Sequence, residues 1–261
     1  MQTRLLTTTS LNEKTTKADT QRRGPMLRVR RRALQAMLPL VPGKITLPIM
    51  SGPARGMLWR RDHCNPCFWL GSYERSKCQA FVRELKATDT FYDIGANSGY
   101  YSLIASSRCK QIVAFEPFPR NVLRFRANMA ANRLTNVTLI DQALSDTVGV
   151  MGFQEGTDTE SGRLSGVGTL EVAVTTLDKF SENAAPPDII KMDIEGAEGA
   201  ALAGGVGMLA QFRPRIFLAT HGEAVHLECL RVLESLDYEI EFLDEDEIIA
   251  RPQSHSGVRA H

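Results

Sequence analysis

The sequence predicts an α/β fold built on a mostly parallel sheet with helices on both faces. From about residue 90 onward, short apolar runs alternate with helical stretches, which is the pattern of parallel strands joined by crossover helices. The chain has 261 residues, of which 43% are hydrophobic, so it can bury one large core. A glycine-rich loop directly after the first apolar run is typical of a ligand-binding turn in such a sheet.

Five apolar runs are the predicted parallel strands, and a hairpin follows them. The five runs are Phe91 to Ile94, Ile112 to Phe115, Val137 to Ile140, Ile189 to Met192 and Ile216 to Ala219. Two further runs, Tyr238 to Leu243 and Ile248 to Ala250, flank an acidic turn and predict a closing antiparallel hairpin at the sheet edge. Val148 to Phe153 and Glu171 to Val174 predict another pair around the glycine-rich loop Gly156 to Gly168.

The connecting segments read as helices with one apolar face. Pro119 suits a first helical turn, and Val122, Phe125 and Met129 follow it at helical spacing. A later helix repeats apolar residues at similar spacing, at Val225, Cys229, Val232 and Leu236. Helices of this kind cover a parallel sheet, so the prediction is a three-layer arrangement.

Composition divides the chain into four parts. Residues 1–33 carry nine Lys and Arg against two acids, and we expect a basic, flexible tail there. Residues 34–86 contain scattered prolines and are expected to form a prefix or lid, residues 87–252 the main domain, and residues 253–261 a short tail.

Charge and cysteine content limit the function classes. The formal net charge of +1 argues against a surface built throughout for nucleic acid. No run approaches the 18 apolar residues of a membrane span, and Met1 to Thr20 lack the apolar core of a signal peptide. Five cysteines without a secretory signal favour a reducing, cytoplasmic location over a disulfide scaffold.

The strongest functional signal is the loop from Asp93 to Gly99, which follows an apolar strand and precedes a helix. Glycines there allow a sharp turn and a close approach of the backbone to a ligand. The pattern is an acid followed by G-x-N-x-G, whereas dinucleotide sites use G-x-G-x-x-G to bind a pyrophosphate. The carboxylate of Asp93 would repel a pyrophosphate and suits a cationic amino-acid group.

A second acid, Glu116, ends the next strand 21 residues after Gly95. A carboxylate at this point can accept hydrogen bonds from both hydroxyls of a ribose. Alone it could be a solvated acid at a strand end, but its distance from the loop favours the ribose interpretation.

A third acidic group follows the strand Ile189 to Met192 and comprises Asp193, Glu195 and Glu198. Such a group can orient a cofactor, bind a divalent cation through oxygen ligands, or accept a proton from a substrate hydroxyl. The alternative is helix capping, because acids in a first turn complement the helix dipole.

His221 follows the fifth strand, at the same edge of the predicted sheet. An imidazole titrates near neutrality, so His221 is a candidate general base together with Asp193. The alternative for His221 is a polar loop residue that caps the next helix.

Several motifs in one order resemble the FkbM family of S-adenosylmethionine-dependent methyltransferases. They are DIGANSGYYS at 93–102, AFEP at 114–117, NV at 136–137, ALSD at 143–146, TLDKF at 176–180 and IIKMDIEGAE at 189–198. The resemblance covers roughly residues 68–240. It implies the Rossmann-like class I methyltransferase fold, a seven-stranded sheet whose seventh strand is antiparallel, and O-methylation of a hydroxyl on a sugar or glycosylated small molecule.

The resemblance also implies roles for individual residues. Asp93, Gly95, Asn97 and Gly99 match the loop at the methionine end of S-adenosylmethionine, and Glu116 matches the ribose acid. Asp141 stands where the adenine is usually met.

Two other functions remain open at this point. The basic tail would suit a nucleic-acid or protein methyltransferase, although the Asn/Asp-Pro-Pro-aromatic run of base methylases is absent after Met192. A scaffold that keeps the fold without turnover is the other alternative. We expect a hydroxylated small-molecule acceptor, no nucleic acid and no membrane span. The acceptor's identity, metal dependence and oligomeric state are left open.

Overall fold

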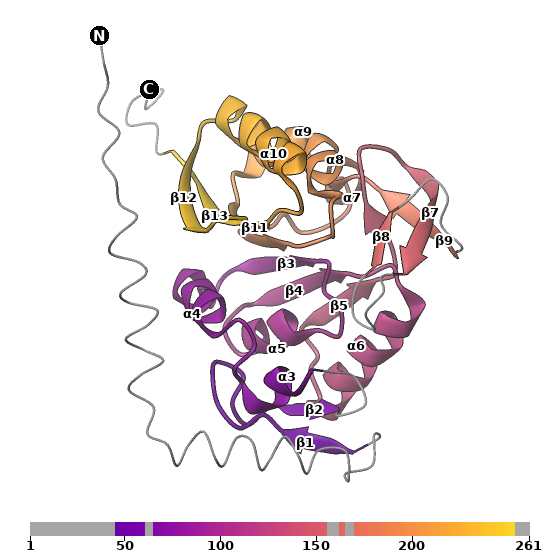
Figure 1. Cartoon of the computed structure of the whole chain (residues 1–261), viewed down its shortest axis with the longest axis vertical. Helices are drawn as coiled ribbons and strands as arrows, with labels where there is room; N and C mark the ends of the chain where they lie inside the picture. The colour runs from indigo at the N-terminus through magenta and orange to yellow at the C-terminus, as the bar shows by residue number, and fades with distance from the viewer. Residues whose placement is uncertain (1–44, 61–64, 156–161, 165–169, 254–261) are drawn as a thin grey trace. The chain divides into compact units, whose positions relative to one another are not determined.

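Figure 1 shows a computed structural model of the chain, which describes residues 45–60, 65–155, 162–164 and 170–253. The described residues from Thr46 onward belong to one compact unit. The predicted basic tail 1–33, residues 254–261 of the C-terminal tail and most of the loop Gly156 to Gly168 lie outside the described residues. The division of the chain at residues 86 and 87 stays a prediction.

A seven-stranded sheet forms the centre of this unit, in the order β12-β13-β11-β10-β3-β4-β5. Its strands are β3 (Thr90–Ile94), β4 (Gln111–Phe115), β5 (Val137–Ile140), β10 (Ile189–Met192), β11 (Arg215–Ala219), β12 (Tyr238–Asp244) and β13 (Glu247–Pro252). β13 is antiparallel to both of its neighbours, and every other pair within the sheet is parallel. The predicted fold class and the edge hairpin are therefore confirmed.

Helices cover both faces of the sheet, as Figure 1 shows. On one side lie α3 (Pro66–Leu70), α4 (Arg75–Glu84), α5 (Tyr100–Ser106) and α6 (Pro119–Ala131); on the other lie α7 (Leu177–Ser181), α8 (Glu198–Ala203), α9 (Val206–Phe212) and α10 (Glu223–Ser235). Each side has its own apolar core. The predicted stripe of α6 is buried at Val122, Phe125 and Met129.

The segment before β3 shares its core with the sheet. Trp59 on β2 (Leu58–Arg60) and Phe68 on α3 are buried in the same apolar cluster as Phe91 and Ile104. β2 pairs antiparallel with β1 (Thr46–Pro48). Residues 46–60 and 65–84 therefore pack as part of the domain in this structure, since their aromatic side chains complete its core.

A second sheet of four strands lies beyond β5, in the order β6-β9-β7-β8. It consists of β6 (Ala143–Leu144), β7 (Gly149–Glu155), β8 (Gly162–Leu164) and β9 (Leu170–Thr175). The predicted pair is present as β7 and β9, which are antiparallel. β6 and β8 were not predicted, because strands of two and three residues carry no periodic pattern.

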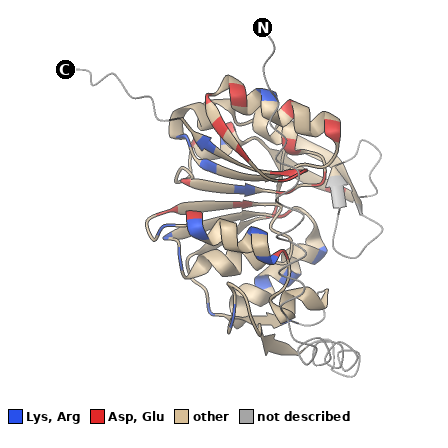
Figure 2. Cartoon of the chain, turned by 60° about the vertical axis from the view of Figure 1, so that its left-hand side comes forward, with Lys and Arg blue, Asp and Glu red and all other residues tan. Residues whose placement is uncertain are grey.

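Charged residues are unevenly spread over the described elements (Figure 2). Most charged residues of α10 and β12 are acidic, whereas α6 carries three arginines and no acidic residue. No helix among the described residues has the length and apolarity to cross a bilayer. The four cysteines in the described ranges are free thiols: Cys67, Cys78, Cys109 and Cys229.

Candidate active site

A cavity of about 250 Å³ lies at the carboxyl ends of β3, β4 and β10. This is close to the lower end of small-molecule sites, which start at roughly 300 Å³. The loops after all three strands contribute to its wall, including Gly95, Asn97, Glu116, Asp193 and Glu195. The loops after these three strands therefore meet at one cavity, as expected for parallel strands, and the predicted acids Glu116 and Asp193 lie in its wall.

The loop after β3 is held tightly against its neighbours. The backbone N–H groups of Gly95 and Ala96 both donate to the carbonyl oxygen of Phe115, each at 3.0 Å. Gly95 has a φ of +77°, and a Cβ built on it would lie 2.0 Å from the carbonyl oxygen of Asp193. Only glycine fits here, since a side chain would both strain the backbone and push the two loops apart.

Glu116 lies in the cavity wall and binds this loop. Its Oε2 accepts the backbone N–H of Asn97 at 2.8 Å, and its Oε1 accepts that of Phe118 at 2.9 Å. The side chain of Asn121 also bonds to the carboxyl group, and burial raises the pKa of Glu116 to about 7. Glu116 thus fixes the loop and presents a polar group to the cavity at the same time.

Two residues of the cavity wall each carry a buried polar atom without a hydrogen-bond partner among the described residues. The Oδ1 of Asn121 and the hydroxyl of Tyr100 are both buried, and no described residue forms a hydrogen bond with either. Tyr100 is 3% exposed and Asn121 4%. Because leaving such groups unbonded costs on the order of 1–3 kcal/mol, these atoms fit a polar ligand that bonds to them.

Three predicted cofactor residues, Asp93, Gly99 and Asp141, do not line the cavity. Asp93 is fully buried, and its Oδ2 accepts the hydroxyl of Ser102 at 2.6 Å. Burial raises the pKa of this carboxyl, and neither Asp93 nor Gly99 is part of the cavity wall. Gly99 has a φ of +91° and begins α5 against Phe125 and Met129.

Asp141 lies on the surface beside the cavity. Its Oδ2 is 2.6 Å from the guanidinium of Arg126, and its side chain is 45% exposed. The three residues that follow it, Gln142, Ala143 and Leu144, are the ones that line the cavity. An adenine contact from Asp141 stays a prediction. Gln142, the next residue along the chain, is the polar residue of this segment that lines the cavity.

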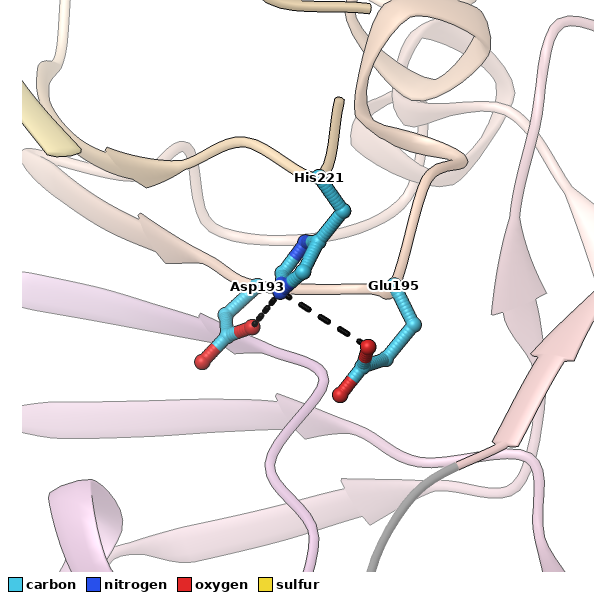
Figure 3. Close-up of side chains that lie close together, drawn as sticks. All are labelled: Asp193, Glu195 and His221. Carbon is cyan, nitrogen blue, oxygen red and sulfur yellow. Dashed lines mark ion pairs between the residues drawn. The ribbon is translucent and has the colours of Figure 1, made fainter. Parts of the chain in front are cut away.

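The acidic loop after β10 gathers around His221, as Figure 3 shows. The Nε2 of His221 lies 3.6 Å from Oδ1 of Asp193 and 3.7 Å from Oε2 of Glu195. On the other side of the ring, Nδ1 forms a 2.8 Å hydrogen bond with Oε1 of Glu198. The sequence provided no reason to distinguish Glu195 from Glu198, but in the structure they lie on opposite sides of the imidazole ring.

Glu198 is fully buried beneath the loop, at the first turn of α8. Its carboxylate also accepts hydrogen bonds from two backbone N–H groups. Oε1 accepts that of Ile194 at 3.0 Å, and Oε2 accepts that of Gly196 at 3.0 Å. These bonds hold the loop in a conformation that places Glu195 at a φ of +56°. Glu198 is therefore a positioning residue, and the predicted alternative of an acid in a first helical turn describes it in part.

Charge interactions set the protonation of this group. The hydrogen bond to Glu198, together with the charges of Asp193 and Glu195, raises the pKa of His221 to about 9. Burial opposes ionisation of Asp193, but the charges of Lys191 and His221 hold its pKa below the ordinary value. His221 without a further ligand is thus protonated at neutral pH and Asp193 is ionised, so the premise of an unperturbed imidazole does not hold.

Aromatic side chains form another part of the cavity wall. Trp59, Phe68 and Tyr73 come from the prefix, and Tyr100 comes from α5. Phe68 stacks on Tyr73 with ring centroids 4.0 Å apart and on Trp59 at 5.3 Å. These rings serve both the core and the cavity.

Sequence reasoning missed Asn121, Tyr100 and Lys191. The available signals were a polar residue on the apolar stripe of α6 and a lysine inside the otherwise apolar strand β10. Lys191 is buried, and its Nζ lies 3.1 Å from Oδ2 of Asp193. A charge in such a strand must be paired, so Lys191 itself pointed to an acid at the strand end.

The seven-stranded sheet with one antiparallel strand, and the cavity at the ends of its parallel strands, have the form of the class I, Rossmann-like methyltransferase fold. The profile of the methyltransferase FkbM domain matches residues 93–240, so the chain belongs to this family. The resemblance read from the motifs is thereby confirmed. Comparison with curated proteins gives no match.

Solved structures with a similar fold include three methyltransferases. Methyltransferase FkbM from Methylobacillus flagellatus KT aligns with 72% of this chain and 55% of its own, at 16% identity and a TM-score of 0.48. Precorrin-6y C5,15-methyltransferase from Geobacter metallireducens aligns with 69% of this chain and 89% of its own, at 16% identity and a TM-score of 0.46. A putative methyltransferase from Streptococcus mutans in complex with SAH aligns with 69% of this chain and 97% of its own, at 11% identity and a TM-score of 0.44. The chain thus spans about half of the first of these proteins.

Proposed function

We propose that this chain is an S-adenosylmethionine-dependent O-methyltransferase that acts on a hydroxyl of a sugar or glycosylated small molecule. The observation that carries the proposal is one cavity that combines Glu116, the unbonded polar atoms of Asn121 and Tyr100, and the carboxylate of Asp193. Family membership supports methyl transfer as the reaction. The cofactor and the acceptor are our inference.

The cofactor end of the site is built on Glu116. Its carboxylate accepts hydrogen bonds from the ribose hydroxyls, and the adjacent Oδ1 of Asn121 is an acceptor for one more. The backbone around Gly95 and Asn97 surrounds the methionine end, and Asp93 and Gly99 support this loop from behind. Adenine lies toward the segment from Asp141 to Leu144, of which the last three residues line the cavity.

Bound S-adenosylmethionine supplies a methyl group on a sulfonium; the acceptor oxygen bonds to that carbon as the carbon–sulfur bond breaks, which leaves S-adenosylhomocysteine. The protein's task is to align and desolvate the acceptor hydroxyl. Asp193 is ionised and faces the cavity, so it can accept the hydrogen bond and then the proton of that hydroxyl. His221 lies beside Asp193, and because it is protonated at neutral pH it can accept a proton from the acceptor only after it has lost its own.

The acceptor class rests on the prefix and on the chemistry of the site. An aromatic wall of Trp59, Phe68 and Tyr73 next to the ionised Asp193 suits a ring that carries hydroxyl groups. Transfer to nucleic acid or protein is the alternative that the basic segment 1–33 suggested. A scaffold without turnover would not need an ionised carboxylate and a buried ribose acid at one cavity.

Incubation of the full chain with S-adenosylmethionine labelled in its methyl group tests the proposal. Acceptors are supplied as separate pools of glycosides, RNA and protein. We expect label in the glycoside pool, in products resistant to mild base as ethers are. We also expect Asp193→Asn to lower the rate by about 10²-fold or more. Label confined to RNA or protein would contradict the proposed acceptor class.

The matched control for this experiment is Asp246→Asn, which removes an exposed carboxylate in the turn between β12 and β13, outside the cavity wall. Its rate with glycosides is expected to stay within about twofold of the native chain. A fall equal to that of Asp193→Asn would show that the rate responds to charge in general.

A further inference from the structure

The group Asp193, Glu195 and His221 has the form of a ligand set around one point (Figure 3). One ligand atom from each lies within 4.8 Å of the others. The distances from Nε2 of His221 to the two carboxylates, 3.6 and 3.7 Å, are too long for hydrogen bonds. Two donors bound to one small ion at about 2.1 Å lie roughly 3.0–4.2 Å apart, and both distances fall in this range.

The orientation of His221 supports this interpretation. Its Nδ1 bonds to Glu198, so in the neutral imidazole the proton is on Nδ1 and the lone pair of Nε2 faces the two carboxylates. Histidine ligands of metal ions commonly donate their second N–H to a carboxylate in this way. Glu198 itself is fully buried and bonded to backbone N–H groups, so it orients the ligand set from behind.

The carboxylates around this point use their oxygens differently. Asp193, Glu195 and Glu198 all pair with the imidazole of His221, and Lys191 pairs with Asp193. Lys191 uses Oδ2 of Asp193, whereas Oδ1 faces His221. The two oxygens of Asp193 therefore serve different partners, and one is available for a metal ion.

We infer that Asp193, Glu195 and His221 bind one divalent metal ion of the Mg²⁺ or Mn²⁺ type. Two carboxylates favour such hard ions, and one imidazole is compatible with Mn²⁺. The side chain of Glu195 is 43% exposed, so it has room to adjust toward the ion. The predicted set of Asp193, Glu195 and Glu198 changes accordingly, with His221 in place of Glu198.

The inference extends the proposed function and rests on it for its role in turnover. Asp193 and Glu195 line the cavity, so an ion bound to them lies beside the acceptor. Three protein ligands leave octahedral positions open, where an acceptor hydroxyl can coordinate. Coordination to the ion would lower the pKa of that hydroxyl, so that its proton can pass to water and its oxygen becomes a better nucleophile. Asp193 then acts as a metal ligand and not as the base.

Titration of the metal-free full chain with Mn²⁺ tests the site, with the signal of free Mn²⁺ followed by electron paramagnetic resonance. We expect one Mn²⁺ per chain with a Kd below about 100 μM, and competition by Mg²⁺. Glu195→Gln and His221→Gln should each weaken binding at least tenfold. Spin-echo spectra of the bound ion should contain nitrogen modulation that His221→Gln removes.

Glu245→Gln is the matched control, because it makes the same change in the exposed acidic turn between β12 and β13. It should leave the Kd unchanged. No binding below millimolar Mn²⁺, or loss of binding in Glu245→Gln and not in Glu195→Gln, would overturn the inference. S-adenosylhomocysteine binding is measured separately on the same proteins: intact binding without Mn²⁺ affinity refutes the metal site alone, whereas its absence from the native chain refutes the proposed cofactor.

Discussion

Glu116 combines a structural and a binding role in one side chain. Its carboxylate accepts backbone N–H groups from Asn97 and Phe118, and it does so while 5% exposed. The cost of this burial appears as a pKa raised to about 7. A ligand that donates hydrogen bonds to the carboxylate would recover part of that cost, which is why an acid is retained at a nearly closed strand end.

Replacement of Glu116 by Gln is expected to flatten the pH dependence of stability in the ligand-free protein. The carboxyl pKa is raised from 4.5 to about 7 on folding, so its contribution is complete below pH 4.5 and is lost as the pH rises through about 7. Denaturant unfolding at pH 5 and pH 8 measures this loss. Glu116→Gln should lose roughly 1–3 kcal/mol less than the native chain between the two pH values.

Asp141→Asn is the control for this measurement, since its carboxylate is exposed and paired with Arg126. It should follow the native pH dependence. An unchanged loss of stability in Glu116→Gln would mean that the buried carboxyl titrates as it does in water.

At the scale of elements, the site depends on close packing of the loops after β3 and β10. The Cβ position of Gly95 lies 2.0 Å from the carbonyl oxygen of Asp193, so the two loops meet at a point with no room for a side chain. Glu198 holds the second loop from below through the N–H groups of Ile194 and Gly196. The cofactor loop and the acidic group around His221 are therefore mechanically linked.

Gly95→Ala is expected to weaken both stability and S-adenosylhomocysteine binding. Gly56→Ala is the matched control, because Gly56 has a φ of +86° but a Cβ added to it would meet no described atom within 4 Å. Both variants strain the backbone, at about 1–2 kcal/mol, and only Gly95→Ala adds the collision. We expect an excess loss of about 2 kcal/mol in unfolding free energy and at least tenfold weaker binding. Equal effects in the two variants would show that loop contact is unimportant.

The order of elements was largely predictable, and the contacts within the site were less so. Apolar runs bounded by acids located β3, β4 and β10 within one residue, because buried parallel strands carry few polar residues. Sequence spacing does not say which way a loop side chain points. Glu195 and Glu198 looked alike in sequence, yet one lies at the cavity and the other beneath the loop.

At the scale of the whole molecule, the described unit joins three contributions to one cavity. The seven-stranded sheet supplies the acidic strand ends, the prefix supplies aromatic rings such as Trp59, and the small sheet supplies Phe153 and Leu164. The family profile covers β4 to β11 and the small sheet, whereas the prefix lies before it. Sequence patterns described the prefix and the small sheet only coarsely, since their fit depends on long-range packing, and we expect acceptor specificity to be set there.

The central claim is that the cavity beside Glu116 binds S-adenosylmethionine, and calorimetric titration with S-adenosylhomocysteine tests it most directly. NAD is the control ligand, because an adenine and a ribose are common to both. We predict micromolar binding of S-adenosylhomocysteine, no binding of NAD, and at least tenfold weaker binding in Glu116→Ala, a loss of about 1.4 kcal/mol. Absence of binding to the folded native chain, or equal binding in Glu116→Ala, would contradict the claim.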